Sequence, residues 1–200
     1  MREEQAAPVP RPFEREQDLA AALRSHDPEA WKQLFQEHYQ RVYNYAYLRT
    51  GNTADSDDIA SSVFVEAVKG IGNFQYRGAP IAAWLFRIAH NETVDALKRR
   101  TRTAMASLDH PEAAEAVDLR DEITSSSNWS DMSEALGRLK PEHRDVLTLR
   151  LVEGHSVADV ARMLGKTEGA VCTLQHRALE RLRKEFDDAQ RDMARKGRRS

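Results

Sequence analysis

The sequence predicts an all-α protein built from two small helical domains that are joined by a flexible acidic linker. Apolar residues recur at helical spacing in two stretches, one before about residue 103 and one after about residue 130. No run alternates apolar and polar residues between glycine-rich turns, as strands do. Pro28, Pro80 and Pro141 stand where helices would begin, which is the place that helices favour for proline.

The first stretch predicts a domain at residues 19–102, after a proline-containing segment, residues 1–18, that we expect to be disordered. Asp27 is placed to cap its first long helix, and a second helix is expected from Asp55 to Lys69. The apolar stripe of the first helix comprises Trp31, Leu34, Phe35, His38, Tyr39, Val42, Tyr45 and Ala46. A third helix opens at Pro80 and ends in a basic cluster.

Helical periodicity fails over residues 103–130, which contain acidic side chains and a serine-rich run, and we interpret them as the linker. A second domain is predicted at residues 131–186, followed by a basic tail, residues 187–200. Within this domain one helix should run from Pro141 to Gly154 and the last from Glu168 to about Phe186. Whether the two domains pack together is left open by the sequence.

Composition excludes several classes of protein. The single cysteine, Cys172, excludes a disulfide framework and a cysteine-rich zinc site, and it favours a reducing, cytoplasmic setting. No stretch approaches the roughly 18 apolar residues of a membrane span, so we expect no membrane insertion. The histidines lack metal-ligand spacing and no catalytic constellation is apparent, which predicts a protein without cofactor, metal or enzymatic activity.

The segment from Ser156 to Arg177 has the pattern of a helix-turn-helix. Ala161 is small enough for the crossing of two helices, and Gly165, four residues later, can adopt the positive φ that the turn requires. The second helix then presents one face to the major groove of DNA. The residues expected on or beside that face are Thr167, Glu168, Gly169, Cys172, Thr173, Gln175, His176, Arg177 and Arg181. The alternative is an ordinary helical hairpin with a solvated basic face.

Both stretches resemble known sequences. Leu136 to Phe186, with its helix-turn-helix, resembles region 4 of the sigma-70 family of RNA polymerase sigma factors. The segment DSDDIASSVFVEAVKGIGNF resembles region 2.2, and YRGAPIAAWLFRIAHNETVDALKRR resembles the part of region 2 that reads and melts the −10 element. Two such motifs in this order, with no domain between them, are typical of the extracytoplasmic-function group.

The resemblance implies three binding surfaces. Region 4 would bind the −35 element through the helix-turn-helix face. Core RNA polymerase, through its β and β′ subunits, would be bound by Asp57, Asp58, Ser61, Ser62 and Val65. The −10 element would be bound by Phe74, Tyr76, Arg77, Asn91, Lys98, Arg99 and Arg100, where aromatic and cationic groups suit unpaired bases. Phe74 is equally well explained as a lid over the bundle core.

The function predicted in this way is promoter recognition, DNA melting and transcription initiation at a specific set of genes. An anti-sigma factor is expected as a further partner, since relatives are commonly inhibited by one. The alternatives are a freestanding helix-turn-helix regulator, which would need a dimer interface, and a small helical enzyme, which would need convergent reactive groups.

Overall fold

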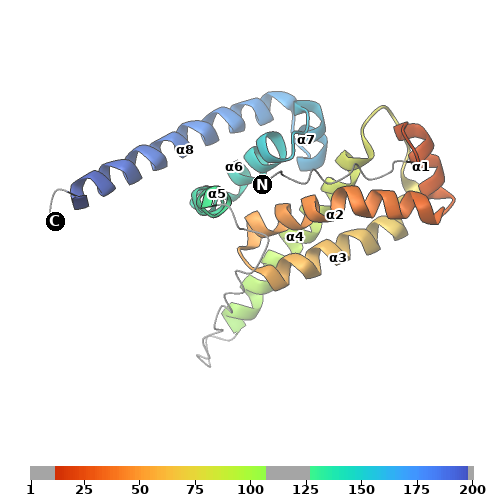
Figure 1. Cartoon of the computed structure of the whole chain (residues 1–200), viewed down its shortest axis with the longest axis horizontal. Coiled ribbons are helices and arrows are strands. Elements are labelled where there is room, and N and C mark those ends of the chain that lie inside the picture. Colours follow the sequence, from red (N-terminus) through yellow and green to blue (C-terminus); the bar gives the residue numbers. More distant parts are fainter. Residues whose placement is uncertain (1–11, 107–126, 198–200) are drawn as a thin grey trace, which may run out of the picture.

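The computed structural model describes residues 12–106 and 127–197, and helices are the only regular elements in these two ranges (Figure 1). The predicted all-α fold with two helical units is therefore confirmed. Most of the predicted linker, residues 103–130, lies outside the described residues, as do most of residues 1–18 and the end of the basic tail.

The N-terminal unit is a bundle of three long helices with a short helix packed at one end. α2, α3 and α4 all contact one another, and α1 contacts α2. The elements are α1 (Glu16–Arg24), α2 (Pro28–Thr50), α3 (Thr53–Gly70), the 3₁₀ turn η1 (Ile71–Asn73) and α4 (Ile81–Ala106). The sequence pattern did not indicate α1, because only Leu19, Ala20 and Leu23 on this short helix are buried.

Polar side chains fix where these helices begin. The Asp27 carboxylate accepts a hydrogen bond from the N–H of Glu29 at 2.8 Å, which caps α2 as the sequence predicts. Gly51, with φ +64°, ends that helix, and the Asn52 side chain accepts from the N–H of Asp55 at 2.8 Å to start α3. The close turn between α2 and α3 holds these two helices antiparallel and side by side (Figure 1).

The C-terminal unit departs from its predicted helices at one place. Its elements are α5 (Ser127–Gly137), α6 (Pro141–Leu147), the π-helical turn η3 (Thr148–Val152), α7 (Val157–Leu164) and α8 (Glu168–Gly197). A single helix was expected from Pro141 to Gly154, but its second half is η3, in which Leu151 remains 55% exposed. α8 also continues beyond Phe186 into the predicted tail.

α7 and α8 form the predicted helix-turn-helix geometry. The Ser156 hydroxyl accepts from the N–H of Asp159 at 3.0 Å and caps α7. Gly165 adopts φ +62° in the turn, and the Thr167 hydroxyl accepts from the N–H of Ala170 at 3.2 Å at the start of α8. The turn therefore depends on a backbone conformation that L side chains adopt only at a cost.

The two units pack directly on each other. α4 contacts α7, while α2 contacts α5, α6 and η3 (Figure 1). Apolar side chains of the C-terminal unit join the buried cluster of the N-terminal bundle; they are Val146, Leu149, Val160, Ala161, Met163 and Val171. The described part of the chain thus has a main core that spans both units. We call this packing the closed arrangement.

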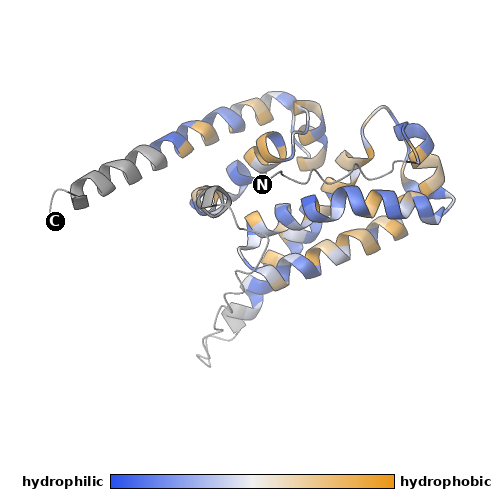
Figure 2. Ribbon diagram, viewed as in Figure 1, coloured by the Kyte–Doolittle hydropathy of each residue, from blue (hydrophilic) through white to orange (hydrophobic). Residues whose placement is uncertain are grey.

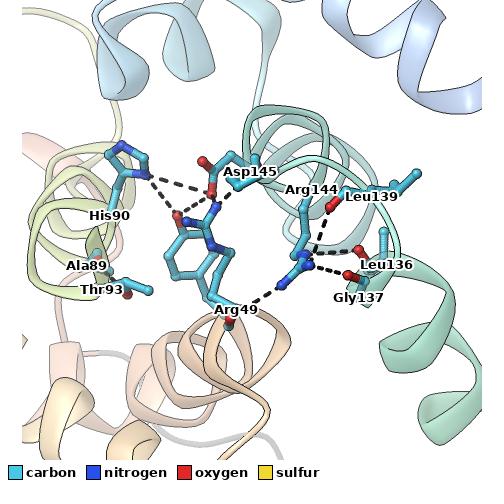
Figure 3. A network of polar contacts seen from close by, with 11 residues as sticks. Arg49, Ala89, His90, Thr93, Leu136, Gly137, Leu139, Arg144 and Asp145 are labelled. Carbon is cyan, nitrogen blue, oxygen red and sulfur yellow. Dashed lines mark hydrogen bonds and ion pairs between the residues drawn. The ribbon is translucent and has the colours of Figure 1, made fainter. Parts of the chain in front are cut away.

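A buried polar network lies inside this contact (Figure 3). Asp145 of α6, only 6% exposed, accepts hydrogen bonds from Arg49 Nη1 and from the Tyr45 hydroxyl, the latter at 3.2 Å. His90 Nδ1 of α4 lies 3.1 Å from the same hydroxyl. Burial raises the pKa of Tyr45 far above its usual value and lowers the pKa of His90, although Asp145 opposes the second shift.

Arg144, the neighbour of Asp145, connects the units through main-chain atoms (Figure 3). Its guanidinium donates to the carbonyl oxygens of Leu136, at 2.9 Å, and of Gly137 and Leu139 at the end of α5. It also donates to the carbonyl of Arg49 at 3.3 Å, close to the end of α2. Two successive residues of α6 therefore reach the same end of α2.

A second set of contacts closes the other side of the interface. Arg41 of α2 donates from Nε to the Glu153 carboxylate at 2.9 Å and from Nη2 to the Glu153 carbonyl at 3.0 Å. The same guanidinium lies 5.4 Å from the ring centre of Phe86, which meets His155 edge-on at 4.8 Å. Burial and, to a smaller extent, the charge of Arg41 lower the pKa of His155 to about 4, although Asp159 opposes the shift.

Replacing Gly165 by alanine should lower the free energy of unfolding by about 1 kcal/mol, because alanine must adopt a left-handed conformation there. Gly169→Ala is the matched control: a Cβ there also meets open space, but Gly169 lies in the first turn of α8, where alanine should stabilise by less than about 1 kcal/mol. Urea titrations of both variants measure this. Shifts of the same sign would contradict the assigned turn.

Acidification should weaken the fold through His155. The pKa of His155 in the folded state, about 4, lies below the ordinary value of 6.5. Between these two pH values the unfolded chain binds more protons than the folded chain, so the free energy of unfolding decreases as the pH is lowered from 6.5 toward 4. His155 alone should cost about 2 kcal/mol between pH 7 and pH 5. His90 acts in the same direction, whereas the raised pKa of Glu153, caused by burial, acts in the opposite one.

His155→Gln should therefore reduce the loss of stability between pH 7 and pH 5, as measured by urea unfolding. The control is His26→Asn, which removes an exposed histidine and tolerates the left-handed backbone at that position. Equal pH dependence of the His155 variant and the unmodified chain would show that the ring is not buried as described.

Candidate functional site

The outer face of α8 presents most of the residues predicted from the helix-turn-helix pattern. Val171 and Ala178 are buried, which turns the opposite side of the helix outward. The exposed residues on or beside that outer side are Thr167, Glu168, Gly169, Cys172, Thr173, His176, Arg177 and Arg181. His176 lies 3.3 Å from Glu180 on the same face. This surface combines small, polar and cationic groups at helical spacing, which suits insertion into a DNA groove.

Gln175 differs from the other predicted residues of α8. It is half-buried, and its side-chain oxygen accepts a hydrogen bond at 3.1 Å from Nε of Arg150 in η3. Arg150 also donates to the carbonyl of His155, just before α7. The arginine thus joins η3, the start of the helix-turn-helix and α8. Its role was not apparent from the sequence, because the π-helical turn that directs it inward was not predicted.

A second surface lies on α3, where the structure leaves the predicted side chains accessible. Asp57, Asp58 and Ser61 are exposed, Val65 is 52% exposed, and Ser62 is half-buried. Figure 2 shows apolar residues along α3 among hydrophilic ones. An exposed valine between polar groups is typical of a protein-docking surface.

This surface extends onto α2, which sequence analysis missed. Phe35 was expected on the inner stripe of its helix, but it is 46% exposed. Its ring stacks on Tyr39 with centres 4.7 Å apart and contacts Phe64 of α3 at 5.0 Å. The Tyr39 hydroxyl donates to Asp57 at 3.3 Å. The predicted apolar stripe of α2 was too wide. The buried side of α2 faces α3 and α4, and the ring of Phe35 lies at the edge of that contact.

The loop between η1 and α4 contains the third group of predicted residues. Phe74 is only 9% exposed and its ring centre lies 5.1 Å from Trp84, as expected for a lid over the core. Tyr76 and Arg77 are exposed beside it. A cleft of about 590 Å³ opens here, with cationic groups contributed by Arg77, Arg87 and, from α7, Arg162. Closure of the two units thus makes α7 one wall of this cleft.

The remaining predicted residues lie along the exposed side of α4. Asn91, Lys98, Arg99 and Arg100 are all exposed, and Arg100 pairs with Asp55 of α3 at 3.2 Å. Exposed ion pairs of this kind contribute little to stability, so the guanidinium can exchange the carboxylate for a phosphate at small cost. The predicted cationic surface is therefore available in the described structure.

Metal-ligand clusters and membrane-spanning helices are both absent from the described residues. Within residues 12–106 and 127–197, no three His, Cys, Asp or Glu side chains gather where they could hold a metal ion. No helix in the described part of the chain is long and apolar enough to cross a membrane.

Comparisons with known proteins match both units. Residues 34–103 match the family described as Sigma-70 region 2, and residues 135–184 match Sigma-70, region 4. The ECF RNA polymerase sigma factor BldN of Streptomyces coelicolor is 34% identical over 175 residues, which cover 86% of this chain and 66% of that protein. The chain thus spans about two thirds of that relative's length.

Other relatives agree along most of their length. The ECF RNA polymerase sigma factor SigM of Mycobacterium tuberculosis is 33% identical over 82% of this chain and 81% of its own. Among solved structures, CnrH in complex with the cytosolic domain of CnrY has a TM-score of 0.67 at 25% identity, over 86% of this chain and 97% of that one. RpoE of Bartonella quintana, solved with the anti-sigma factor NepR, shares the fold with a TM-score of 0.63 at 22% identity, over 78% of this chain and 96% of that one.

With region 2 and region 4 both matched in order, and with relatives named as ECF sigma factors above 30% identity, the chain belongs to the extracytoplasmic-function group of the sigma-70 family of RNA polymerase sigma factors.

Proposed function

We propose that this sigma factor directs core RNA polymerase to promoters by using the three surfaces separately. The observation that carries the proposal is the outer face of α8, where a helix-turn-helix leaves exposed polar and cationic side chains beside a buried anchor, Val171. On this proposal α8 reads the −35 element in the major groove, and Arg177 and Arg181 bind backbone phosphates. Thr173 and His176 are placed to meet base edges.

The −10 element is assigned to the loop after η1 and to the exposed side of α4. Tyr76 offers an aromatic face, and Arg77 with the Lys98 to Arg100 cluster supplies cations, a combination suited to single-stranded DNA. Asn91 lies on the same helix. In the closed arrangement Phe74 supports this surface from below, through Trp84. It would need to move to meet a base.

Core polymerase is assigned to the surface on α3, with the β and β′ subunits as the partners. Asp57, Asp58, Ser61, Ser62 and Val65 form its predicted part. The exposed Phe35 and the half-buried Tyr39 enlarge it with aromatic area, which is enriched at the centres of protein interfaces. We further propose that the chain acts in the cytoplasm without catalytic activity of its own. Binding by an anti-sigma factor is also proposed, since RpoE of Bartonella quintana, which shares the fold, was solved in complex with one.

A freestanding regulator with the same helix-turn-helix is the second candidate, but it is not favoured. Such proteins bind twofold-symmetric sites as dimers. Here the N-terminal unit matches sigma region 2 and packs against its own C-terminal unit.

The direct test is transcription in vitro from fragmented host DNA by purified core polymerase, with and without this protein. New discrete start sites that share sequence motifs near −10 and −35 are expected. Absence of such starts, with a core polymerase that is active with another sigma factor, would overturn the proposal.

Arg177→Ala should weaken promoter binding across all sequences and reduce the steepness of its salt dependence by about one unit, as loss of one phosphate contact requires. Arg138→Ala is the matched control, since it removes an exposed arginine in the turn after α5 that pairs with Glu134 of that helix. Binding of the holoenzyme to a promoter fragment is titrated at several salt concentrations. An unchanged slope would remove Arg177 from the contacts.

Val65→Asp should weaken binding to core polymerase at least about tenfold, because it replaces the exposed apolar side chain of the proposed docking surface by a charge. The fold should be unaffected, since this side chain is half in solvent. Ala21→Asp, at an exposed position of α1, is the control. Competition with a labelled sigma factor for core polymerase provides the readout, and equal affinity of the two variants would place the docking surface elsewhere.

A further inference from the structure

The loop of residues 74–80, which joins η1 to α4, carries part of the proposed −10 surface. It contains no regular element, and its Gly78 adopts φ +78°. A loop of this kind samples many conformations unless other parts of the chain hold it, and ordering it when DNA binds would cost affinity. A fixed geometry of the exposed Tyr76 and Arg77 therefore depends on what holds the two ends of the loop.

Both ends of this loop are hydrogen-bonded to α1, which contacts η1 beside the start of the loop (Figure 1). At the start, Arg24 Nη1 donates to the main-chain carbonyl of Phe74 at 3.4 Å. Just after the end, the Glu16 carboxylate accepts at 2.9 Å from the N–H of Ile81, the first residue of α4. A carboxylate is well suited to this place, because the first N–H groups of a helix lack partners within it.

The spacing of the two side chains on α1 allows them to reach both ends of the loop. Glu16 and Arg24 are two turns apart, so they lie on one side of the helix and about 12 Å apart along its axis. Ala20, midway between them, is buried in the main core. The segment before α1 is anchored as well, since the buried Gln33 of α2 exchanges two hydrogen bonds with the main chain of Phe13.

We propose that Glu16 and Arg24 are positioning residues for the −10 surface. They hold the loop, and with it Tyr76 and Arg77, in the geometry that binds the unpaired −10 strand. We call this pair the α1 clamp. The inference rests on the proposed function, because it concerns one of the surfaces assigned there. It adds an element outside the family match, since α1 precedes residues 34–103, which match Sigma-70 region 2.

The negative charge of Glu16 separates positioning from a direct contact with DNA. A carboxylate near DNA repels the phosphates, so loss of the charge alone should strengthen binding. Loss of a group that fixes the start of α4 and the loop before it should weaken binding instead. Arg24 offers no such contrast, because an arginine also binds phosphates directly. Glu16 is therefore the decisive residue of the α1 clamp.

The test uses holoenzyme assembled from core polymerase and the full-length chain. Its probe is a fluorescent single-stranded DNA that carries the −10 element of a promoter found by the transcription experiment. Glu16→Ala should lower the affinity for this strand about fivefold, whereas Glu16→Gln, which keeps an acceptor oxygen, should stay within about twofold of the parent. Asp18→Ala is the matched control, because Asp18 is an exposed carboxylate in the same first turn of α1.

Two further measurements separate positioning from a loss of fold. Binding to a duplex that carries only the −35 element should be unchanged in Glu16→Ala, because the α1 clamp belongs to the N-terminal unit. Amide hydrogen exchange in the full-length chain should become faster in residues 74–81 of Glu16→Ala and should stay as in the parent in α2 and α3. General loss of fold would accelerate exchange in all of these segments.

Equal affinity of Glu16→Ala and Asp18→Ala for the −10 strand would overturn the α1 clamp. A higher affinity of Glu16→Ala would overturn it too, since that is the effect of charge alone. Unchanged exchange in residues 74–81 would do so whether or not a promoter is found. Failure of the proposed function gives a different pattern, because then the parent starts no transcription at discrete sites with active core polymerase, while the difference in exchange remains.

Discussion

A carboxylate buried between two helical units determines how the structure is arranged. Asp145 belongs to the C-terminal unit, but its partners Arg49 and Tyr45 belong to α2. A buried charge needs its partners in place, so the position of α6 against α2 is fixed by this group. Arg144 then fixes the end of α5 to the same point, and the packing of α7 on α4 follows. Apolar burial supplies the attraction between the units, whereas Asp145 selects one orientation.

The elements that could be predicted are those with local causes. The bounds of α2 follow from capping by Asp27 and from the backbone preferences of Pro28 and Gly51, and the turn before α8 follows from Gly165. These effects can be predicted because each involves only a few neighbouring residues. The same holds for the outward positions on α8, which follow from helical spacing around Val171. These features required no knowledge of the remainder of the chain.

The features that were missed depend on contacts between distant residues. Nothing near Asp145 in the sequence identifies Arg49, 96 positions away, as its partner. Phe35 has the spacing of an inner residue, and only the placement of α3 shows that it lies at the rim. The turn η3 interrupts a segment whose composition suits an ordinary helix, and it directs Arg150 to α8. Periodicity shows which side of a helix is buried, but it does not identify what covers that side.

The bond between Arg150 and Gln175 has a consequence for the modularity of promoter recognition. Recognition helices are attractive units for exchange between relatives, since their outward residues can be replaced as a block. In this chain the helix is held from behind by a residue of a different element, which also fixes the start of the helix-turn-helix. If α8 were transferred to a relative that lacks Arg150, it would keep its outward side chains but would lose the contact that sets its orientation, and on the proposed function it would then lie differently in the DNA groove. On the proposed function, the smallest segment that carries promoter specificity therefore begins at Thr148, well before α8.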